Sequence, residues 1–201
     1  MKRGSFRQWK EDILNNEGKI LLSLLFFIIA ILLTIISGNY VDETRSISVP
    51  DLILDHIPVV NLTFLFVYGI SLVVLVFILY PLIFKPKKFY YYMGMLSLFL
   101  SVRSAFLVLT HLKAPIGAIS IPATGIFSIL TYSNDLFFSG HAGLPFLGFL
   151  IFENKKLKYF MLISSIVLAA TSLLMHVHYS IDVASSYFIT YGIYVIGKKI
   201  F

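Results

Sequence analysis

The stretch Ile20–Ser37 reads ILLSLLFFIIAILLTIIS, and none of its side chains is charged. A helix needs roughly 17–25 apolar residues, at about 1.5 Å each, to cross the hydrocarbon core of a bilayer, so this run is long enough. A basic, polar segment precedes it, as in a signal peptide, but no cleavage site of small residues follows. We therefore interpret the run as a retained transmembrane helix.

Apolar runs of similar length recur along the rest of the chain. Five more lie at Val59–Phe84, Phe89–Thr110, Leu136–Phe152, Leu157–Met175 and Ile181–Ile196. Each is close to the length that a spanning helix needs, although the runs that begin at Leu136 and Ile181 are near the lower limit. These runs predict an all-α polytopic membrane protein, with six transmembrane helices bundled into one domain over residues 20–201.

The composition agrees with a membrane protein. Of the 201 residues, 58% are hydrophobic and 13% are charged, against about 45–50% and about 25% in soluble domains. The basic residues lie in short clusters between apolar runs, so retention of positive loops on the cytoplasmic side explains the high pI, and nucleic acid is not expected as a partner. The chain has no Cys, which excludes disulfides and cysteine metal sites.

The charge pattern also predicts an orientation. If six helices alternate, the basic N-terminus and the clusters at 85–88, 155–158 and 198–199 all fall on one side. Both termini are therefore expected in the cytoplasm. Residues 1–19 are predicted to form an amphipathic segment on the cytoplasmic surface of the membrane, because apolar side chains recur among its polar ones.

Unusual polar residues stand at the starts of two predicted helices on the non-cytoplasmic side: His141 at one, and His178 and Asp182 at the other. Ionisable side chains in a membrane generally face a protein interior or a water-filled path. His178 and Asp182 are four residues apart and share a helix face, so the carboxylate could orient one ring nitrogen and leave the other as a nucleophile. His141 could then protonate a leaving oxygen.

Other interpretations of these residues stay open on chemistry alone. The cluster could move protons or transfer phosphate, and His176, His178 and Asp182 could hold a divalent metal. The metal interpretation is weakened by the spacing, since side chains two residues apart on a helix point to different faces. A histidine at a helix end is, moreover, often simply interfacial.

Two motifs carry a resemblance to a known family. Asp135-x-x-x-Ser139-Gly140-His141 and residues 178–187, which begin His178-Tyr179-Ser180-Ile181-Asp182, resemble the paired motifs of the sphingomyelin synthases. Those enzymes belong to the type 2 phosphatidic acid phosphatase superfamily. The segment from Tyr92 through Arg103 to Pro115, and the loop Val49–Asp55, are similar to further parts of the family.

The resemblance implies a six-helix bundle with a catalytic triad and no metal or other cofactor. By carry-over, His178 attacks phosphorus, Asp182 orients His178, and His141 protonates the departing diacylglycerol oxygen. A glycerophospholipid would be the donor, and the phosphohistidine would pass its head group to an acceptor such as ceramide, or to water. The active site would lie on the non-cytoplasmic face.

The chain departs from the family at several positions. The phosphatases carry a basic first motif that is absent here, and an arginine where this chain has Ser172. The loss of two phosphate-binding cations favours the synthase-like branch. That branch has Cys-Gly before its Asp, where this chain has Ser133 and Asn134.

Four further residues are predicted to bind the phosphate or the head group. Arg103 is the candidate phosphate clamp, although an internal ion pair with Asp135 or snorkelling to the interface would also suit it. Asp135 could instead pair with His141, contact a cationic head group or cap a helix. Ser139 and Gly140 would let backbone N–H groups approach the phosphate closely.

The sequence thus predicts a lipid phosphotransferase, with a lipid phosphatase that uses water as the close alternative. A different class is a lipid transporter or scramblase whose polar cluster lines a pathway. Paired breaks in two halves of the chain would favour transport, and the single Pro145 within a predicted helix gives that interpretation little support.

Overall fold

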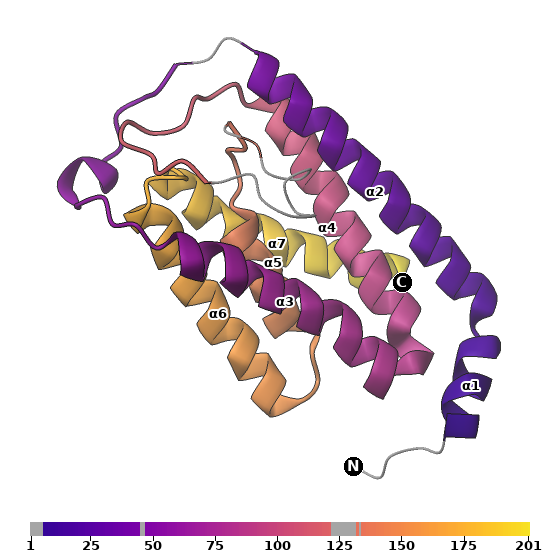
Figure 1. The fold of residues 1–201 in the computed structure, drawn as a ribbon. Coiled ribbons are helices and arrows are strands. Elements are labelled where there is room, and N and C mark those ends of the chain that lie inside the picture. The colour runs from indigo at the N-terminus through magenta and orange to yellow at the C-terminus, as the bar shows by residue number, and fades with distance from the viewer. Residues whose placement is uncertain (1–5, 45–46, 122–131, 133) are drawn as a thin grey trace.

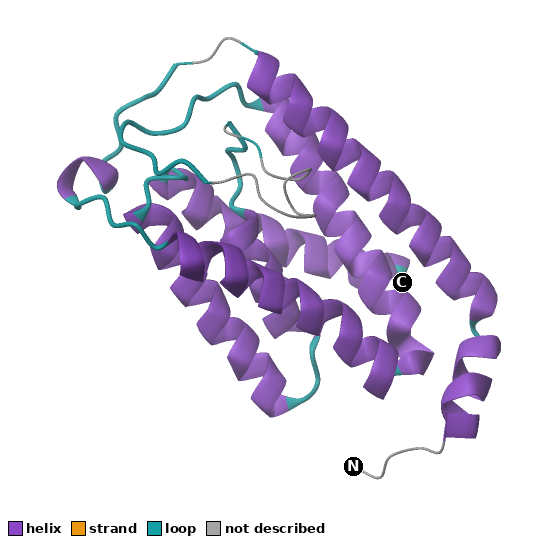
Figure 2. Cartoon of the chain, viewed as in Figure 1, coloured by secondary structure: helices purple, strands orange, loops and turns teal. Residues whose placement is uncertain are grey.

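The computed structural model describes residues 6–44, 47–121, 132 and 134–201. Lys2 and Arg3 of the basic N-terminus, and Ser133 next to the first motif, lie outside these residues. The described chain is helical, without a strand (Figures 1 and 2). Its α-helices are α1 (Phe6–Leu14), α2 (Glu17–Glu43), α3 (Thr63–Phe84), α4 (Phe89–Leu109), α5 (Gly140–Ile151), α6 (Lys155–Leu174) and α7 (Ser180–Ile200). Short 3₁₀ turns lie at Leu54–His56 and Pro86–Lys88.

The predicted all-α class is confirmed, and a helix forms at each of the six apolar runs. Within the described residues, four helices are long and apolar enough to cross a membrane: Glu17–Glu43, Thr63–Phe84, Pro86–Leu109 and Lys155–Leu174. Helix α5 has only 12 residues, or about 18 Å, which is shorter than a hydrocarbon core of about 30 Å. Helix α7 is long enough but carries the buried Asp182 and several hydroxyl side chains. By length and composition, four helices are therefore candidate membrane spans among the described residues, and the count of six spans stays a prediction.

The start of α5 differs from the prediction. Helix α5 begins at Gly140 and not at Leu136, because residues before Ser139 are not helical. Leu136 and Phe138 are buried all the same, and the Phe138 ring lies 5.4 Å from that of Phe99. Phe137 between them has φ of 53°, in the left-handed region that side chains seldom adopt. Apolar residues that a helical pattern would claim are thus buried as a loop that leads into the first motif.

Tight packing in the middle of the bundle holds α5 against its neighbours. The described core includes Phe77, Phe99, Leu147 and Met161, none more than 1% exposed. Helices α2 and α4 run side by side (Figure 1), and a buried contact of 3.3 Å joins the hydroxyls of Thr34 and Ser104. Such hydroxyl contacts suit helix packing in lipid, where water-driven burial gives little attraction between helices.

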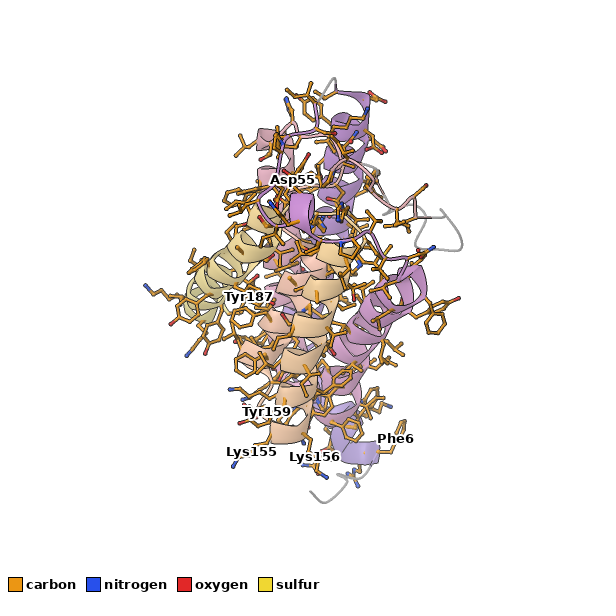
Figure 3. All side chains as sticks on the ribbon, turned by 90° about the vertical axis from the view of Figure 1, so that its left-hand side faces the viewer. Phe6, Asp55, Lys155, Lys156, Tyr159 and Tyr187 are labelled. Carbon is orange, nitrogen blue, oxygen red and sulfur yellow. The ribbon has the colours of Figure 1, made fainter. Side chains whose placement is uncertain are left out.

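The two ends of the bundle have different chemistry. At one end, Lys85 and Lys88 bind Glu153, and Lys87 lies 3.5 Å from Asp12 of α1. Figure 3 shows Lys155, Lys156 and Phe6 at this same end of the bundle. It shows the loop with Asp55 at the opposite end. The structure thus brings the basic clusters of the described chain together at one end of the bundle. That this end is cytoplasmic, and that α1 lies on the membrane surface, stay predictions.

Gly143 tests how closely α5 is packed. A Cβ at Gly143 would lie 2.8 Å from Thr190 Oγ1 and 3.0 Å from the Phe99 ring, whereas one at Gly192 of α7 would meet nothing within 4 Å. We expect Gly143→Ala to cost about 1–3 kcal/mol through overpacking. The matched Gly192→Ala should be neutral or stabilise by about 0.5–1 kcal/mol, since alanine favours a helix. Thermal unfolding in detergent would measure both, and equal melting temperatures for the two variants would contradict this packing.

Candidate functional site

The two motifs meet through their backbones at the starts of α5 and α7. The Ser139 N–H donates to the carbonyl oxygen of Asp182 over 3.1 Å. Ser139 is the residue that precedes α5, and Asp182 lies in the first turn of α7. The Asp182 carboxylate also turns back to accept from the N–H of Tyr179 at 2.9 Å, as an acid in the first turn commonly does. One residue therefore closes the start of its own helix and docks the other motif.

His178 and Asp182 form the predicted pair. His178 Nδ1 lies 3.4 Å from Asp182 Oδ2, and both side chains are buried. The expected four-residue register on one helix face is confirmed in part, because His178 sits two residues before α7 and the local turn brings it onto that face. The contact directs Nδ1 toward the carboxylate, which leaves Nε2 as the available ring nitrogen.

His141 joins this pair from the first turn of α5. Ser139, two residues before it, bonds the Asp182 carbonyl, and Gly140, next to it, lies against Arg103. The His141 ring stacks on Phe66 of α3, with 3.6 Å between the ring centroids and 18° between the planes. Stacking on a buried aromatic ring holds the imidazole in one orientation. The structure thus brings together the three side chains that the sequence singled out as a triad.

Arg103 and Asp135 form an ion pair, with 2.7 Å between Nη2 and Oδ1. Of the alternatives for Arg103, the internal pair is the one observed. Asp135 does not cap α5, because Ser139 occupies that position. The guanidinium also lies against the start of α5, since a Cβ at Gly140 would be 3.2 Å from Arg103 Nε. Gly140 therefore leaves space for a cation beside the first helical turn.

Four buried polar atoms around this point have no hydrogen-bond partner within the described part of the chain. They are Arg103 Nε, Ser139 Oγ, His141 Nε2 and Asp182 Oδ1. An unsatisfied buried donor or acceptor costs about 1–3 kcal/mol, so a cluster of four is unusual in a stable fold. Two of them can donate to an anion, and His141 Nε2 can exchange a proton. The arrangement fits a site for a phosphate ester.

The alternative metal set is not assembled. Among the described residues, no three His, Cys, Asp or Glu side chains are grouped to hold a metal ion. His176 has φ of 55°, and its Nδ1 faces the carbonyl of Ile116 at 3.3 Å. It therefore belongs to the loop packing. Ser172, where the phosphatases have an arginine, donates to the Leu168 carbonyl and adds no cation to the site.

Asp51 is a residue whose part in the site the sequence analysis missed. Its Oδ2 accepts from the Ser180 N–H at 2.7 Å and from the Ser180 hydroxyl at 2.9 Å, while Oδ1 accepts from the N–H groups of Ile53 and Leu54. Asp51 thus ties the first loop to the start of α7, beside His178. An Asp that accepts from N–H groups two and three residues on is a common turn pattern, but its second partner lies 129 residues away.

Tyr179 is held by the same loop. Its hydroxyl donates to the Lys113 carbonyl at 2.8 Å and accepts from the Val49 N–H at 3.0 Å, and its side chain is 1% exposed. Tyr179 is therefore a buried cross-link between three loops. Tyr187, further along α7, accepts from the Ser165 hydroxyl at 3.3 Å.

Replacing Asp51 with alanine tests this anchor. We expect Asp51→Ala to lower stability by about 3 kcal/mol, because bonds to a charged acceptor contribute about 1.5–3 kcal/mol each and do not add fully. Turnover should fall with it, since Ser180 and the start of α7 lose their tie. Asp55→Ala, which removes only one 3.2 Å contact on the same loop, is the matched control and should cost less than Asp51→Ala, which removes four.

The difference in stability between wild type and Asp51→Ala should also depend on pH. Burial alone raises the pKa of Asp51, but the N–H groups of Leu54, Ser180 and Ile53 outweigh it and hold the pKa below its ordinary value of 3.8. A carboxyl whose pKa is lower in the folded state stabilises the fold above its unfolded pKa, and this contribution disappears as the pH falls through the folded pKa. The gap in melting temperature between wild type and Asp51→Ala should be full near neutral pH and shrink below 3.8. A gap unchanged down to that range would contradict the anchor.

Comparison with known proteins agrees with this geometry. Residues 133–199 match the family model described as PAP2 superfamily C-terminal. The matched third of the chain includes both motifs, and with them His141, His178 and Asp182. No curated protein and no solved structure matches the chain. The carboxy-terminal third of the chain, which carries both motifs, is therefore similar to the PAP2 superfamily.

Proposed function

We propose that the chain is an integral membrane lipid phosphotransferase. It moves the phospho-head group of a glycerophospholipid, through a phosphohistidine on His178, to an acceptor hydroxyl such as that of ceramide. The observation that carries this proposal is the convergence of His141, His178 and Asp182 at two helix starts, inside the matched domain. Active sites of this kind need a nucleophile, a group that orients it and a proton donor within mutual reach.

The first half of the reaction follows from the ring nitrogens. With Nδ1 of His178 directed at Asp182, the lone pair on Nε2 attacks phosphorus, and the bond from phosphorus to the glycerol oxygen breaks. His141 Nε2 gives its proton to that oxygen, which leaves as diacylglycerol. The contact of 3.4 Å between His178 and Asp182 is long for a hydrogen bond. Such contacts often shorten only when the substrate is bound.

The phosphate oxygens would be held from the side of α4 and α5. Arg103 Nε and Ser139 Oγ are buried donors without another partner in the described chain. The first N–H groups of α5 have no partner in their own helix, and a helix start favours an anion. Arg103 keeps one nitrogen on Asp135 and would use another for the phosphate, since a guanidinium carries five N–H donors. This supports the predicted binding roles of Arg103, Asp135, Ser139 and Gly140.

The acceptor in the second half of the reaction decides whether the enzyme is a transferase or a phosphatase. The acceptor hydroxyl gives its proton to His141, its oxygen attacks phosphorus, and His178 is released. Ceramide as acceptor rests on the likeness of the two motifs to those of the sphingomyelin synthases. Water as acceptor would make the same intermediate a lipid phosphatase. We place this face outside the cytoplasm, because the basic clusters lie at the opposite end.

His178→Ala tests the nucleophile and the acceptor together. Purified protein in mixed micelles would receive phosphatidylcholine, phosphatidylethanolamine or phosphatidic acid, each with and without ceramide. We expect diacylglycerol and a ceramide phospholipid from wild type, measured by mass spectrometry, and a loss of about 10⁴-fold or more in His178→Ala. His111→Ala, an exposed histidine in a loop at the same end, is the matched control and should keep wild-type turnover.

The products separate the outcomes. Free phosphate or phospho-alcohol in place of the ceramide product would make the enzyme a phosphatase. Turnover retained in His178→Ala would show that the nucleophile is another residue. No turnover on any lipid by folded wild-type protein would contradict the proposal for these substrates.

His141→Ala tests the proton donor. A good leaving group needs no proton, so the rate on nitrophenyl phosphate esters should fall by less than about 10-fold, while the rate on alkyl esters falls by about 10²–10⁴-fold. Steady-state rates with both ester classes would measure the ratio. Equal losses for the two classes would argue against protonation of the leaving oxygen by His141.

A further inference from the structure

A cavity lies at the opposite end of the bundle from His178. Its volume is about 700 Å³, within the range of roughly 300–1,000 Å³ that is usual for ligand sites. The end of α5, the start of α6, the start of α4 and the end of α7 enclose it. Figure 3 shows Lys155 and Tyr159 of its lining at the far end from Asp55. The cavity therefore does not belong to the proposed reaction site.

The lining is strongly basic. It contains Lys88, Lys155, Lys158 and Lys198 but only one acidic side chain, Glu153. Four lysines against one glutamate leave a net formal charge of +3. Three neighbouring tyrosines of α4, Tyr90–Tyr92, add hydroxyl donors. Several donors and a positive charge around one space suit an anion.

Glu153 does not neutralise this charge. Its carboxylate binds Lys88 and also Lys85, which lies outside the lining. Hydrogen bonds from Lys88 and then Lys85 hold the pKa of Glu153 below its ordinary value, although burial acts in the other direction. Glu153 thus stays ionised, and its carboxylate is already paired with Lys85 and Lys88. It is therefore not paired with the other three lysines of the lining.

The other three lysines have no acidic partner in the described part of the chain. The Lys158 ammonium lies 4.9 Å from the centre of the Phe149 ring, and that of Lys198 lies 5.3 Å from the Tyr194 ring. Contact with an aromatic face is worth only about 0.5–1 kcal/mol at exposed sites and leaves the N–H donors free. Lys155 has neither an ion pair nor a ring contact among the described residues.

Apolar surface continues from the mouth of the cavity along α6 and α7. Tyr159 is 60% exposed and Ile163 61%, and on α7 Ile196 and Ile200 are 55% and 60% exposed. In a membrane protein such side chains face acyl chains. A ligand with a phosphate in the cavity and hydrocarbon beside these helices would match both surfaces at once.

We propose that this cavity binds the phosphate-bearing head group of an anionic phospholipid, with its acyl chains along α6 and α7. Basic spaces between helices at one membrane face are the usual recognition sites for such head groups. Lys155, Lys158 and Lys198 contact the phosphate, and the tyrosines bound the head group. The site is separate from the phosphotransferase reaction and does not rest on it.

Two charge-matched variants test the site in the full-length chain. Lys155→Gln, Lys158→Gln and Lys198→Gln together remove the three unpaired lysines. Lys10→Gln, Lys156→Gln and Lys199→Gln together remove the same charge from exposed lysines outside the lining. Both sets would also carry His178→Ala, so that no lipid is consumed, and equal melting temperatures would show that both are folded.

Binding would be measured by native mass spectrometry and by titration in nanodiscs. Phosphatidylglycerol and phosphatidic acid would be compared with phosphatidylcholine of the same acyl chains, and with free inorganic phosphate. We expect the anionic lipids to bind more tightly than phosphatidylcholine, and the lining variant to bind them about 100-fold more weakly, since each lysine near a membrane contributes roughly fivefold. The control variant should lose less than about threefold, because its lysines lie outside the cavity.

Three results would overturn the proposal. The first is an equal loss in the two variants, which would mean attraction by net charge alone. The second is equal affinity for phosphatidylcholine and the anionic lipids. The third is inorganic phosphate that binds as tightly as the lipids, which would make this a site for a soluble anion. These binding results could still be interpreted if the lipid phosphotransferase assay failed, because binding is measured without turnover.

Discussion

Asp182 is the residue on which the rest of the site depends. Its carbonyl accepts the N–H of Ser139 and so docks α5 against α7, while its carboxylate accepts the N–H of Tyr179 and faces His178. A carboxylate that is wholly buried is costly unless hydrogen bonds and neighbouring charges offset that cost. The Tyr179 N–H and His178 contact Oδ2, whereas Oδ1 has no partner among the described residues. These contacts lie at the junction of two motifs about forty residues apart in the chain. The capping of the start of α7, the docking of the two motifs and the orientation of His178 thus depend on one residue.

A second constraint is the meeting of an apolar bundle with a polar cluster. The helices around the site bury large aromatic side chains, and His141 is stacked on one of them, Phe66. In such surroundings a polar atom without a hydrogen-bond partner is destabilising. Arg103, Ser139 and His141 nevertheless each have one buried polar atom without a partner among the described residues. Proteins retain this kind of cost where a ligand supplies the missing partners. The cluster therefore supports the proposed binding site even apart from the family match.

The two ends of the helix bundle carry different side chains. Loops tied together by Asp51 and Tyr179 hold the reacting groups at one end. The other end gathers lysines around a cavity and around Glu153. Because like charges close together repel and need an anion to balance them, the lysine end fits the proposed head-group site, while the histidine end fits the proposed transfer of one phosphate.

The sequence by itself determined the all-α class and singled out the residues on which the proposed chemistry rests. Long apolar runs predicted six helices, because a chain in lipid must satisfy its backbone within helices, and the spacing of His178 and Asp182 predicted their contact. Only the tertiary structure decided that Arg103 pairs with Asp135, that Leu136 and Phe138 are buried within a loop, and that Asp51 anchors Ser180. Local periodicity reports which face of a helix is apolar, whereas these contacts join residues that are far apart in the chain and depend on how the helices pack. The same reason hid the lysine cavity, since its lining comes from the ends of four helices.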